Sequence, residues 1–238
     1  MIIGRRFTVI ANNFLDNFVP PILRDSFIFS WLAKAVFKNA PYSIEYFKEH
    51  AFEMSQVEFR RFYEETSLRV HQGETDLSPD SAAAVMTNIS EGPVLEVGCG
   101  GGWLSSRIAK THDVIATDIS VRGSYVSLQH SGFTAIESDA SAIPFKTDSF
   151  STVVCTHTLE HVVNFQAALD ELRRVCSGKL IIVVPRQRPY KVTFSPHLHF
   201  FPYRWSVLAY TGNQYLSSLD LVGGDWLLIE DHSPHSVV

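Results

Sequence analysis

The sequence predicts an α/β protein built on a doubly wound, mostly parallel sheet that ends in an antiparallel hairpin. From residue 78 onward, short apolar runs of strand length alternate with stretches whose apolar residues recur at helical spacing. A glycine-rich stretch, "LEVGCGGGWL" at residues 95–104, includes the end of the first apolar run. Near the end of the chain, two strand-like runs flank Gly223 and Gly224, a pair that suits a tight hairpin. Strands that alternate with helices in this way form a parallel sheet covered on both faces.

The expected elements follow one another regularly. A first helix is expected after Ser78, which suits an N-cap, with Pro79 at the first helical position. The expected strands are "GPVLEVG" (92–98), "DVIATD" (113–118), "FTAIESD" (133–139), "FSTVVCTH" (150–157), "KLIIVVP" (179–185), "QYLSSLDL" (214–221) and "WLLIED" (226–231). The expected helices between them are "WLSSRIAK" (103–110), "VRGSYVSLQHS" (121–131) and "NFQAALDELRRVCS" (164–177).

The N-terminal third has a different composition. Residues 1–77 are rich in Phe, Tyr, Arg and Glu at helical spacing and contain no clear strand. We therefore expect an N-terminal helical extension or lid over residues 1–77 and a ligand-binding sheet domain over residues 78–238. A chain of 238 residues can bury one core with such an appendage.

Composition also bears on location and partners. The net charge of −5 shows no basic excess, so we expect no nucleic-acid partner. The three cysteines show no metal-ligand spacing, which favours a reduced, cytoplasmic protein without a bound metal. The stretch "FIFSWLAKAVF" (27–37) is too short to cross a membrane. It fits either a helix packed on the main domain or a peripheral surface that contacts a membrane or a lipid-like substrate.

The glycine-rich stretch predicts a nucleotide site at the first strand-to-helix turn. Glycine lets the backbone approach a ligand there, at the carboxyl ends of the strands. Asp118 ends the next strand about 20 residues further on, where an acid can bind two ribose hydroxyls. Two details argue against a pyrophosphate ligand: Trp103 stands where a dinucleotide motif has glycine, and Glu96 adds a negative charge. A carboxylate suits a ligand that carries an ammonium group.

Four blocks in order resemble one family. They are "LEVGCGGG", "ATDIS", "ESDASAIPFKTDSFSTVVCTHTLEHV" and "ELRRVCSGKLIIVVP", and the resemblance covers roughly residues 80–230. These blocks are similar to the class I S-adenosylmethionine-dependent methyltransferases, in particular the small-molecule, ubiquinone-biosynthesis-like branch. The resemblance implies a Rossmann-like fold, S-adenosylmethionine as cofactor and a small-molecule acceptor. One departure is Cys176-Ser177-Gly178, where the family often has Pro-Gly-Gly.

The same resemblance implies a cofactor site. It implies that Glu96 orients the methionine amino group and that Asp118 takes the ribose hydroxyls. The other implied cofactor residues are Gly98, Cys99, Gly100, Gly102, Ile119, Asp139, Ala140 and Thr156. Plain structural roles stay open for Asp139, as a loop acid, and for Cys99, as a small core residue.

Candidates for catalysis and acceptor binding follow the fourth and fifth strands. His157 and His161 are candidate bases, needed only if the acceptor loses a proton early. For His161, a structural role in capping or packing the next helix stays equally open. No acidic residue occurs between Glu171 and Asp220, while basic residues and histidines gather after the fifth strand. This pattern fits either an anionic acceptor or a solvated rim. The candidate acceptor residues are Tyr63, Arg186, Arg188, His197 and His199.

Two other functions stay open on the sequence. One is a non-catalytic nucleotide-binding module, and the other is a nicotinamide-dependent oxidoreductase, against which Glu96 and Trp103 argue. The methyl acceptor, the atom methylated, the use of a base, the oligomeric state and the role of the N-terminal helices are not determined by the sequence.

Overall fold

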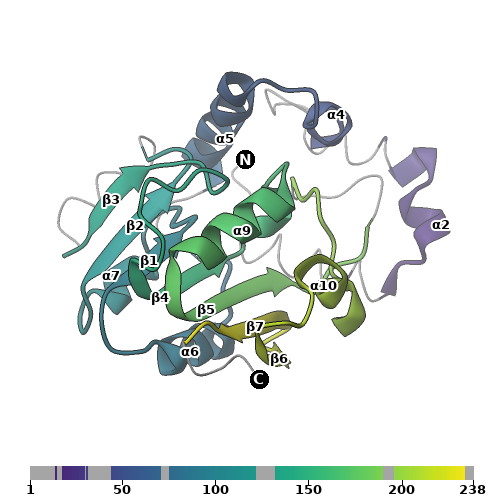
Figure 1. Cartoon of the computed structure of the whole chain (residues 1–238). Coiled ribbons are helices and arrows are strands. Elements are labelled where there is room, and N and C mark those ends of the chain that lie inside the picture. The colour runs from purple at the N-terminus through teal and green to yellow at the C-terminus, as the bar shows by residue number, and fades with distance from the viewer. Residues whose placement is uncertain are drawn as a thin grey trace.

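The fold centres on one seven-stranded sheet with the strand order β3-β2-β1-β4-β5-β7-β6 (Figure 1). The structure is a computed structural model that describes residues 14, 18–29, 31, 44–70, 75–121, 132–189 and 196–233. Strands β1 to β5 run parallel, and β7 pairs antiparallel with both β5 and β6. The predicted doubly wound, mostly parallel sheet with a C-terminal antiparallel hairpin is therefore confirmed.

The elements agree with the sequence prediction apart from small shifts at their ends. The strands are β1 (Val94–Val97), β2 (Val114–Asp118), β3 (Thr134–Glu137), β4 (Phe150–Thr156), β5 (Cys176–Pro185), β6 (Leu216–Val222) and β7 (Asp225–Asp231). The helices are α2 (Pro21–Arg24), α4 (Ile44–His50), α5 (Gln56–Val70), α6 (Pro79–Asn88), α7 (Ser105–Ile108), the 3-10 helix η1 (Leu159–His161), α9 (Phe165–Val175) and α10 (Arg204–Thr211). The predicted helix at 121–131 lies almost entirely outside the described residues.

Successive side chains of β5 point to opposite faces of the sheet, and both faces are covered. Leu180, Ile182 and Val184 belong to one buried cluster with the apolar face of α9. Ile181 and Val183 point to the opposite face and pack with residues of α6 and α7. Because both faces are buried, the strand reads as a continuous apolar run in the sequence.

Local signals mark several element ends. Ser78 accepts a hydrogen bond from the Ser81 amide at 3.0 Å, so the predicted N-cap of α6 is confirmed. Gly223 and Gly224 both have positive φ angles, of 58° and 98°, which a two-residue hairpin loop favours. The helix α9 ends at Val175, two residues earlier than predicted, because Cys176 already begins β5.

The strand order reverses between β1 and β4. From β1 the chain moves outward to β2 and β3, and it then returns to the other side of β1 to form β4. The connections after β1 and β4 therefore diverge and leave a crevice at their carboxyl ends. Ligands of open α/β sheets bind in such a crevice.

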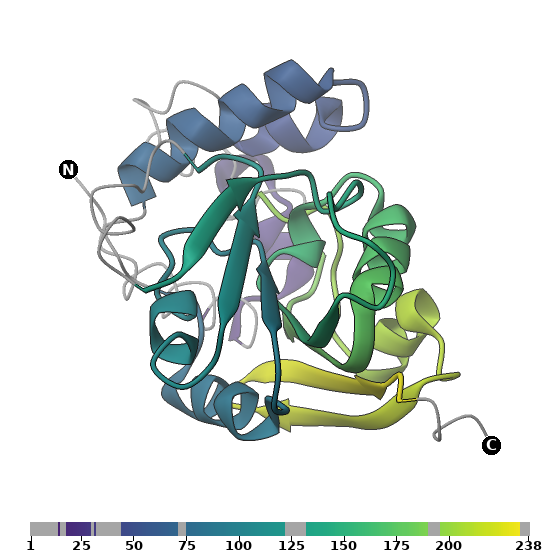
Figure 2. The ribbon, with the colours of Figure 1, turned by 60° about the vertical axis from the view of Figure 1, so that its left-hand side comes forward.

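Helix α5 lies over this carboxyl edge. Figure 2 shows α5 above the ends of the teal strands. The ion pair between Arg60 of α5 and Glu137 at the end of β3 holds the helix there. Helices α4 and α5 pack on each other through Phe47 and Phe62, whose rings stack 3.9 Å apart. This placement agrees with a lid, although the boundary after residue 77 stays a prediction.

The segment around α2 exposes large apolar side chains. Phe18, Ile22, Phe27 and Trp31 are all more than 60 % exposed. Of the stretch 27–37, however, only residues 27–29 and 31 are described, and Ser30 and Lys34 lie outside the described residues. Among the helices that the structure describes, none has the length and apolar character needed to cross a membrane. Both interpretations of this stretch therefore stay predictions.

A buried ion pair ties α9 to the antiparallel end of the sheet. Glu230 of β7 is 2 % exposed and accepts hydrogen bonds from Arg173 Nε at 2.9 Å and from Arg173 Nη2 at 2.5 Å. Burial acts to raise the pKa of Glu230, but the bonds from Arg173 and His232 outweigh it and leave this pKa below its usual value. Arg173 also donates to the Thr211 carbonyl at 2.6 Å, so one guanidinium joins α9, α10 and β7.

We predict that Arg173→Leu lowers the free energy of unfolding by about 3 kcal/mol near neutral pH, because it leaves the buried Glu230 carboxylate with His232 as its remaining partner. The loss should shrink as the pH falls and Glu230 takes up a proton in the variant. Denaturant unfolding at several pH values measures this effect. Lys146→Leu, at an exposed loop position, is the control and should change stability little. An equal loss at acidic and neutral pH would contradict the proposed cause.

Candidate active site

The glycine loop after β1 turns sharply at the base of the crevice. The Gly98 and Cys99 amides both donate to the Thr117 carbonyl, at 2.7 and 3.0 Å. Gly98 has a φ of 78°, and a Cβ atom there would overlap the side chain of Thr158. Gly100 has a φ of 50°, but a Cβ atom there would meet no described atom within 4 Å. Gly98 is therefore required by packing, whereas the space beside Gly100 is open to a ligand.

Asp118 lies at the end of β2 and faces this loop. Its Oδ2 accepts a hydrogen bond from the Gly100 amide at 2.8 Å, and its Oδ1 accepts one from the Ser120 amide at 3.1 Å. Burial raises the pKa of Asp118 above its usual value, and the amide donors oppose this shift. The sequence predicted that Asp118 and the glycines act together, and the structure brings them into direct contact.

Glu96 lies beneath the loop in β1. Its side chain is almost fully buried and accepts a hydrogen bond from the Ser105 hydroxyl, at the first position of α7. Burial raises the pKa of Glu96 to about 8. A bound cation beside this carboxyl would favour its ionised form.

The other predicted cofactor residues lie on the same edge. Thr156 ends β4, and Cys99 is buried in the loop without a disulfide. Asp139 accepts hydrogen bonds from the Ser141 amide and hydroxyl, at 2.8 and 2.7 Å, which is the contact expected of a loop acid. Ala140 packs against the core, and Ile119 directly follows Asp118. The Gly102 amide donates a hydrogen bond to the Cys99 carbonyl within the loop.

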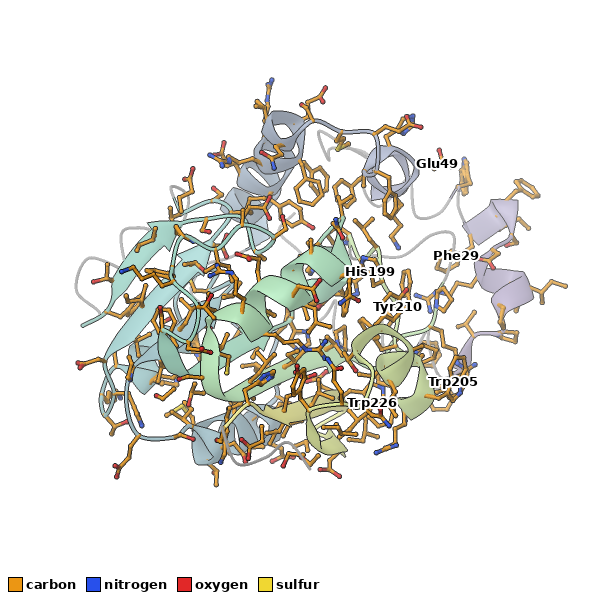
Figure 3. The ribbon with its side chains drawn as sticks, viewed as in Figure 1. Phe29, Glu49, His199, Trp205, Tyr210 and Trp226 are labelled. Atoms are coloured by element: carbon orange, nitrogen blue, oxygen red, sulfur yellow. The ribbon has the colours of Figure 1, made fainter. Side chains whose placement is uncertain are left out.

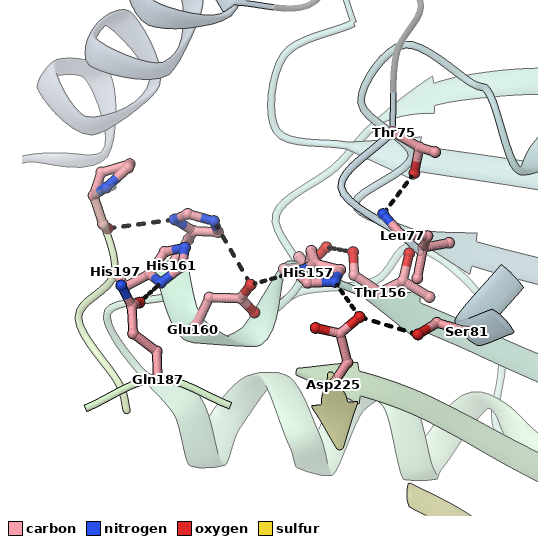
Figure 4. A network of polar contacts seen from close by, with 12 residues as sticks. Thr75, Leu77, Ser81, Thr156, His157, Glu160, His161, Gln187, His197 and Asp225 are labelled. Carbon is pink, nitrogen blue, oxygen red and sulfur yellow. Dashed lines mark hydrogen bonds and ion pairs between the residues drawn. The ribbon is translucent and has the colours of Figure 1, made fainter. Parts of the chain in front are cut away.

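His157 lies between two carboxylates. Its Nδ1 is 3.4 Å from Glu160 Oε1, and its Nε2 is 3.4 Å from Asp225 Oδ2 (Figure 4). Burial opposes the charged form, but these two acids outweigh it and raise the pKa of His157 to about 10. An imidazole that is already protonated at neutral pH has no lone pair to accept a proton. The contacts therefore argue against the predicted role of His157 as a base and favour a structural one.

His161 lies on the crevice side of Glu160 and next to α5. Its ring is 5.9 Å from the ring of Tyr63 and 4.7 Å from that of His197, measured between centroids. The Tyr63 hydroxyl is buried and has no hydrogen-bond partner within the described part of the chain. Tyr63, His161 and His197, which are far apart in the sequence, thus form one group beside the crevice.

The remaining acceptor candidates are less closely gathered. Arg186 and Arg188 are exposed after β5. The Nε2 atom of His199 lies 2.8 Å from the Val162 carbonyl, and its ring packs against Tyr210 at a centroid distance of 5.4 Å (Figure 3). The structure therefore joins only His197 and Tyr63 to the group around His161.

Three polar residues at this edge were not among the predicted site residues. Glu160 is fully buried between His157 and His161, Gln187 contacts His197, and Ser105 bonds to Glu96. Glu160 stands in the "LEH" block, so the sequence carried a signal for it. Gln187 and Ser105 carry no comparable signal, because only the fold brings them to their partners.

Comparison with known proteins agrees with this geometry. Residues 95–183 match the family described as "Methyltransferase domain". An uncharacterized protein of Methanocaldococcus jannaschii is 37 % identical over 93 residues, which cover 38 % of this chain and 40 % of that protein. The chain thus spans less than half of the length of the curated relatives that it matches.

Solved structures share the fold over a larger part of the chain. A protein of Pyrococcus horikoshii has a TM-score of 0.56 and 19 % identity, over 72 % of this chain and 98 % of that one. A structure described as a SAM-dependent methyltransferase from Aquifex aeolicus has a TM-score of 0.52 and 15 % identity, over 78 % and 100 %. Residues 95–183 therefore match a methyltransferase domain, and the sheet that contains them has the fold of the SAM-dependent methyltransferase from Aquifex aeolicus.

Proposed function

We propose that this protein transfers a methyl group from S-adenosylmethionine to a small-molecule acceptor. The observation that carries the proposal is the junction of Gly100 and Asp118, where an open glycine turn and a carboxylate meet at the reversal of the strand order. Packing does not explain the glycine at position 100, because a Cβ atom there would meet no described atom within 4 Å. A ribose bound there would find both a carboxylate acceptor and close backbone.

The residues at this edge fit the cofactor by their chemistry. Asp118 would accept hydrogen bonds from the ribose hydroxyls, and Glu96 would face the methionine ammonium group. The bound cofactor supplies an electrophilic methyl group. The contribution of the chain is to align the acceptor with that group and to exclude water.

The acceptor side of the proposed site is formed by α5 and η1. Tyr63 presents a buried hydroxyl without a described partner, next to His161. An unpaired buried hydroxyl costs free energy, so a role toward a bound acceptor explains why a tyrosine rather than a phenylalanine stands there. His161 is the remaining candidate base, since His157 is held in its charged form. Residues 1–77 would then act as a lid over the acceptor.

Finer features of the acceptor rest on the sequence. The basic segment after β5 supports an anionic acceptor, and the aromatic side chains around Tyr63 support a partly apolar one. O-, N- or C-methylation all fit this surface. Membership of the ubiquinone-biosynthesis-like branch, a cytoplasmic location and peripheral contact with a membrane are further parts of the proposal.

Two rival functions make different predictions. A non-catalytic module would bind S-adenosylmethionine without turnover of any acceptor. An oxidoreductase would bind NAD in preference to S-adenosylmethionine. The buried Glu96 argues against the second rival, because it lies beneath the turn that would hold a pyrophosphate.

We predict that the full chain binds S-adenosylmethionine with a dissociation constant of low micromolar order, which corresponds to a binding free energy of about 8 kcal/mol. We expect NAD to bind far more weakly. Asp118→Ala should weaken S-adenosylmethionine binding by about 1.5–3 kcal/mol, because the ribose loses a charged acceptor. Titration calorimetry measures both quantities. Asp113→Ala, at an exposed position before β2, is the control and should bind like the wild type. If titration with NAD gave binding heat and titration with S-adenosylmethionine gave none, the methyltransferase proposal would be overturned.

We predict opposite effects of Glu96→Gln on stability and on cofactor binding. The pKa of Glu96 is about 8 in the fold and about 4.3 in an unfolded chain, so the folded state binds more protons between these values. This carboxyl therefore lowers stability as the pH rises from about 4 to 8, by up to about 1.4 kcal/mol per pH unit. At pH 8 the variant should be more stable than the wild type, and at pH 4 the two should have the same stability. The variant should nevertheless bind S-adenosylmethionine more weakly.

Thermal unfolding without ligand, at a series of pH values, measures the stability part. Glu91→Gln, at an exposed loop position, is the control and should follow the wild type at every pH. A Glu96→Gln variant that is less stable at pH 8 would contradict the buried-carboxyl argument. Unchanged S-adenosylmethionine binding would contradict the role toward the ammonium group.

We predict that Tyr63→Phe leaves the fold and S-adenosylmethionine binding nearly unchanged but lowers turnover at least about tenfold, the effect of losing one hydrogen bond of about 1.4 kcal/mol in the transition state. Turnover is followed as release of S-adenosylhomocysteine with a panel of small carboxylate, phosphate, phenol and amine acceptors. Tyr210→Phe is a matched control on α10. Full activity of Tyr63→Phe would place the acceptor elsewhere.

A further inference from the structure

Three potential metal ligands meet beside the proposed acceptor site. Glu160 and His161 come from η1 after β4, and His197 comes from the segment that follows β5. One ligand atom from each side chain lies within 4.8 Å of the other two. Figure 4 shows His161 and His197 on one side of Glu160 and His157 on the other. The cysteine spacing in the sequence predicts no metal, but this donor set is assembled only by the fold.

The hydrogen bonds of the two histidines leave the same ring atom free. His161 Nδ1 lies 3.3 Å from the Pro196 carbonyl oxygen, and His197 Nδ1 lies 2.5 Å from Gln187 Oε1. A carbonyl oxygen can only accept, so each Nδ1 carries the proton. Each neutral ring then has its lone pair on Nε2. Metal-binding histidines are oriented in this way, with the second nitrogen donating to a carbonyl or carboxylate.

Glu160 supplies an independent observation. Its side chain is fully buried, and neither carboxylate oxygen has a hydrogen-bond partner within the described residues. Oε1 has ion-pair contacts with His157 at 3.4 Å and with His161 at 3.9 Å. The charged His157 balances this carboxylate from one side, while on the side of His161 no described donor lies within hydrogen-bond distance, although an unpaired buried oxygen is costly.

We propose that Glu160, His161 and His197 bind one divalent transition-metal ion. Two imidazoles and one carboxylate suit Zn²⁺, Fe²⁺, Mn²⁺ or Co²⁺, whereas Ca²⁺ and Mg²⁺ prefer oxygen ligands alone. Ligand atoms at about 2.0–2.2 Å from one ion lie no more than about 4.4 Å apart, so small side-chain rotations would close the site. Three protein ligands leave a coordination position open.

The location gives this ion a role in acceptor binding. The ring of Tyr63 lies against His161, and its hydroxyl is the buried group that lacks a described partner. An acceptor oxygen bound at the open position would lie close to the Tyr63 hydroxyl. The ion would favour the deprotonated form of that acceptor oxygen. Only this last step rests on the proposed methyl transfer. The binding of the ion itself does not.

Titration of the untagged, metal-free full chain with Co²⁺, followed by visible absorption, tests the site without any other ligand. We expect one equivalent to give the intense absorption of low-coordinate Co²⁺, and Zn²⁺ to displace it. Glu160→Gln, His161→Ala and His197→Ala should each weaken Co²⁺ binding at least about tenfold, the lower end of the losses measured even for outer-shell partners of metal ligands. His199→Ala is the matched control in the same segment, because the Val162 carbonyl engages its Nε2, and it should bind Co²⁺ like the wild type.

Circular dichroism establishes that each variant is folded before it is titrated. A wild-type chain that shows no saturable Co²⁺ absorption, or three folded variants that bind as tightly as the wild type, would overturn the proposal. The first result would leave Glu160 as a carboxylate balanced by His157 alone. Because no S-adenosylmethionine is present, failure of methyl transfer would not affect this test.

Discussion

The close approach of the β1 and β4 connections is the constraint on which the site depends. Gly98 follows β1 and turns directly against Thr158, which follows β4. The contact lies where the strand order reverses. From here the connection after β1 leads to β2, and the connection after β4 leads to β5 on the opposite side of the β1–β4 pair. Any side chain at position 98 would push them apart. The open turn at Gly100 and the group around His161 are both positioned by this contact.

The edge of the sheet concentrates acidic groups that are costly to bury. Glu96, Asp118 and Glu160 all lie at or near the carboxyl ends of the central strands, and burial raises the pKa of Glu96 and of Asp118. Each is supported in a different way: by the Ser105 hydroxyl, by backbone amides and by the charged His157. Perturbed acids gathered in one crevice are typical of functional sites. Away from this edge, the buried carboxylate of Glu230 is compensated by Arg173.

The fold by itself does not define the chemistry. The solved structures share the sheet at 19 % identity or less, so they support the architecture and not an acceptor. In this chain the carboxyl edge is covered by α5, which carries Tyr63, and by the segment that carries His197. Specificity in such domains resides in these covering elements, since the sheet beneath them is shared.

The sequence by itself determined the sheet, its hairpin and the position of Asp118 beside the glycine loop. The alternating runs, the Gly223-Gly224 turn and the N-cap at Ser78 are local signals that act through backbone geometry over a few residues. Asp118 could be paired with the glycine loop because consecutive parallel strands end on the same edge.

Only the tertiary structure decided what surrounds the histidines. Nothing in their spacing shows that His157 lies between Glu160 and Asp225, or that His197 meets His161 and Gln187. These contacts join residues from η1, β7 and the segment after β5, whose separation in the chain carries no periodic signal. A protonated His157 and an unpaired Tyr63 hydroxyl follow from burial and from partners, and both are properties of the packed state.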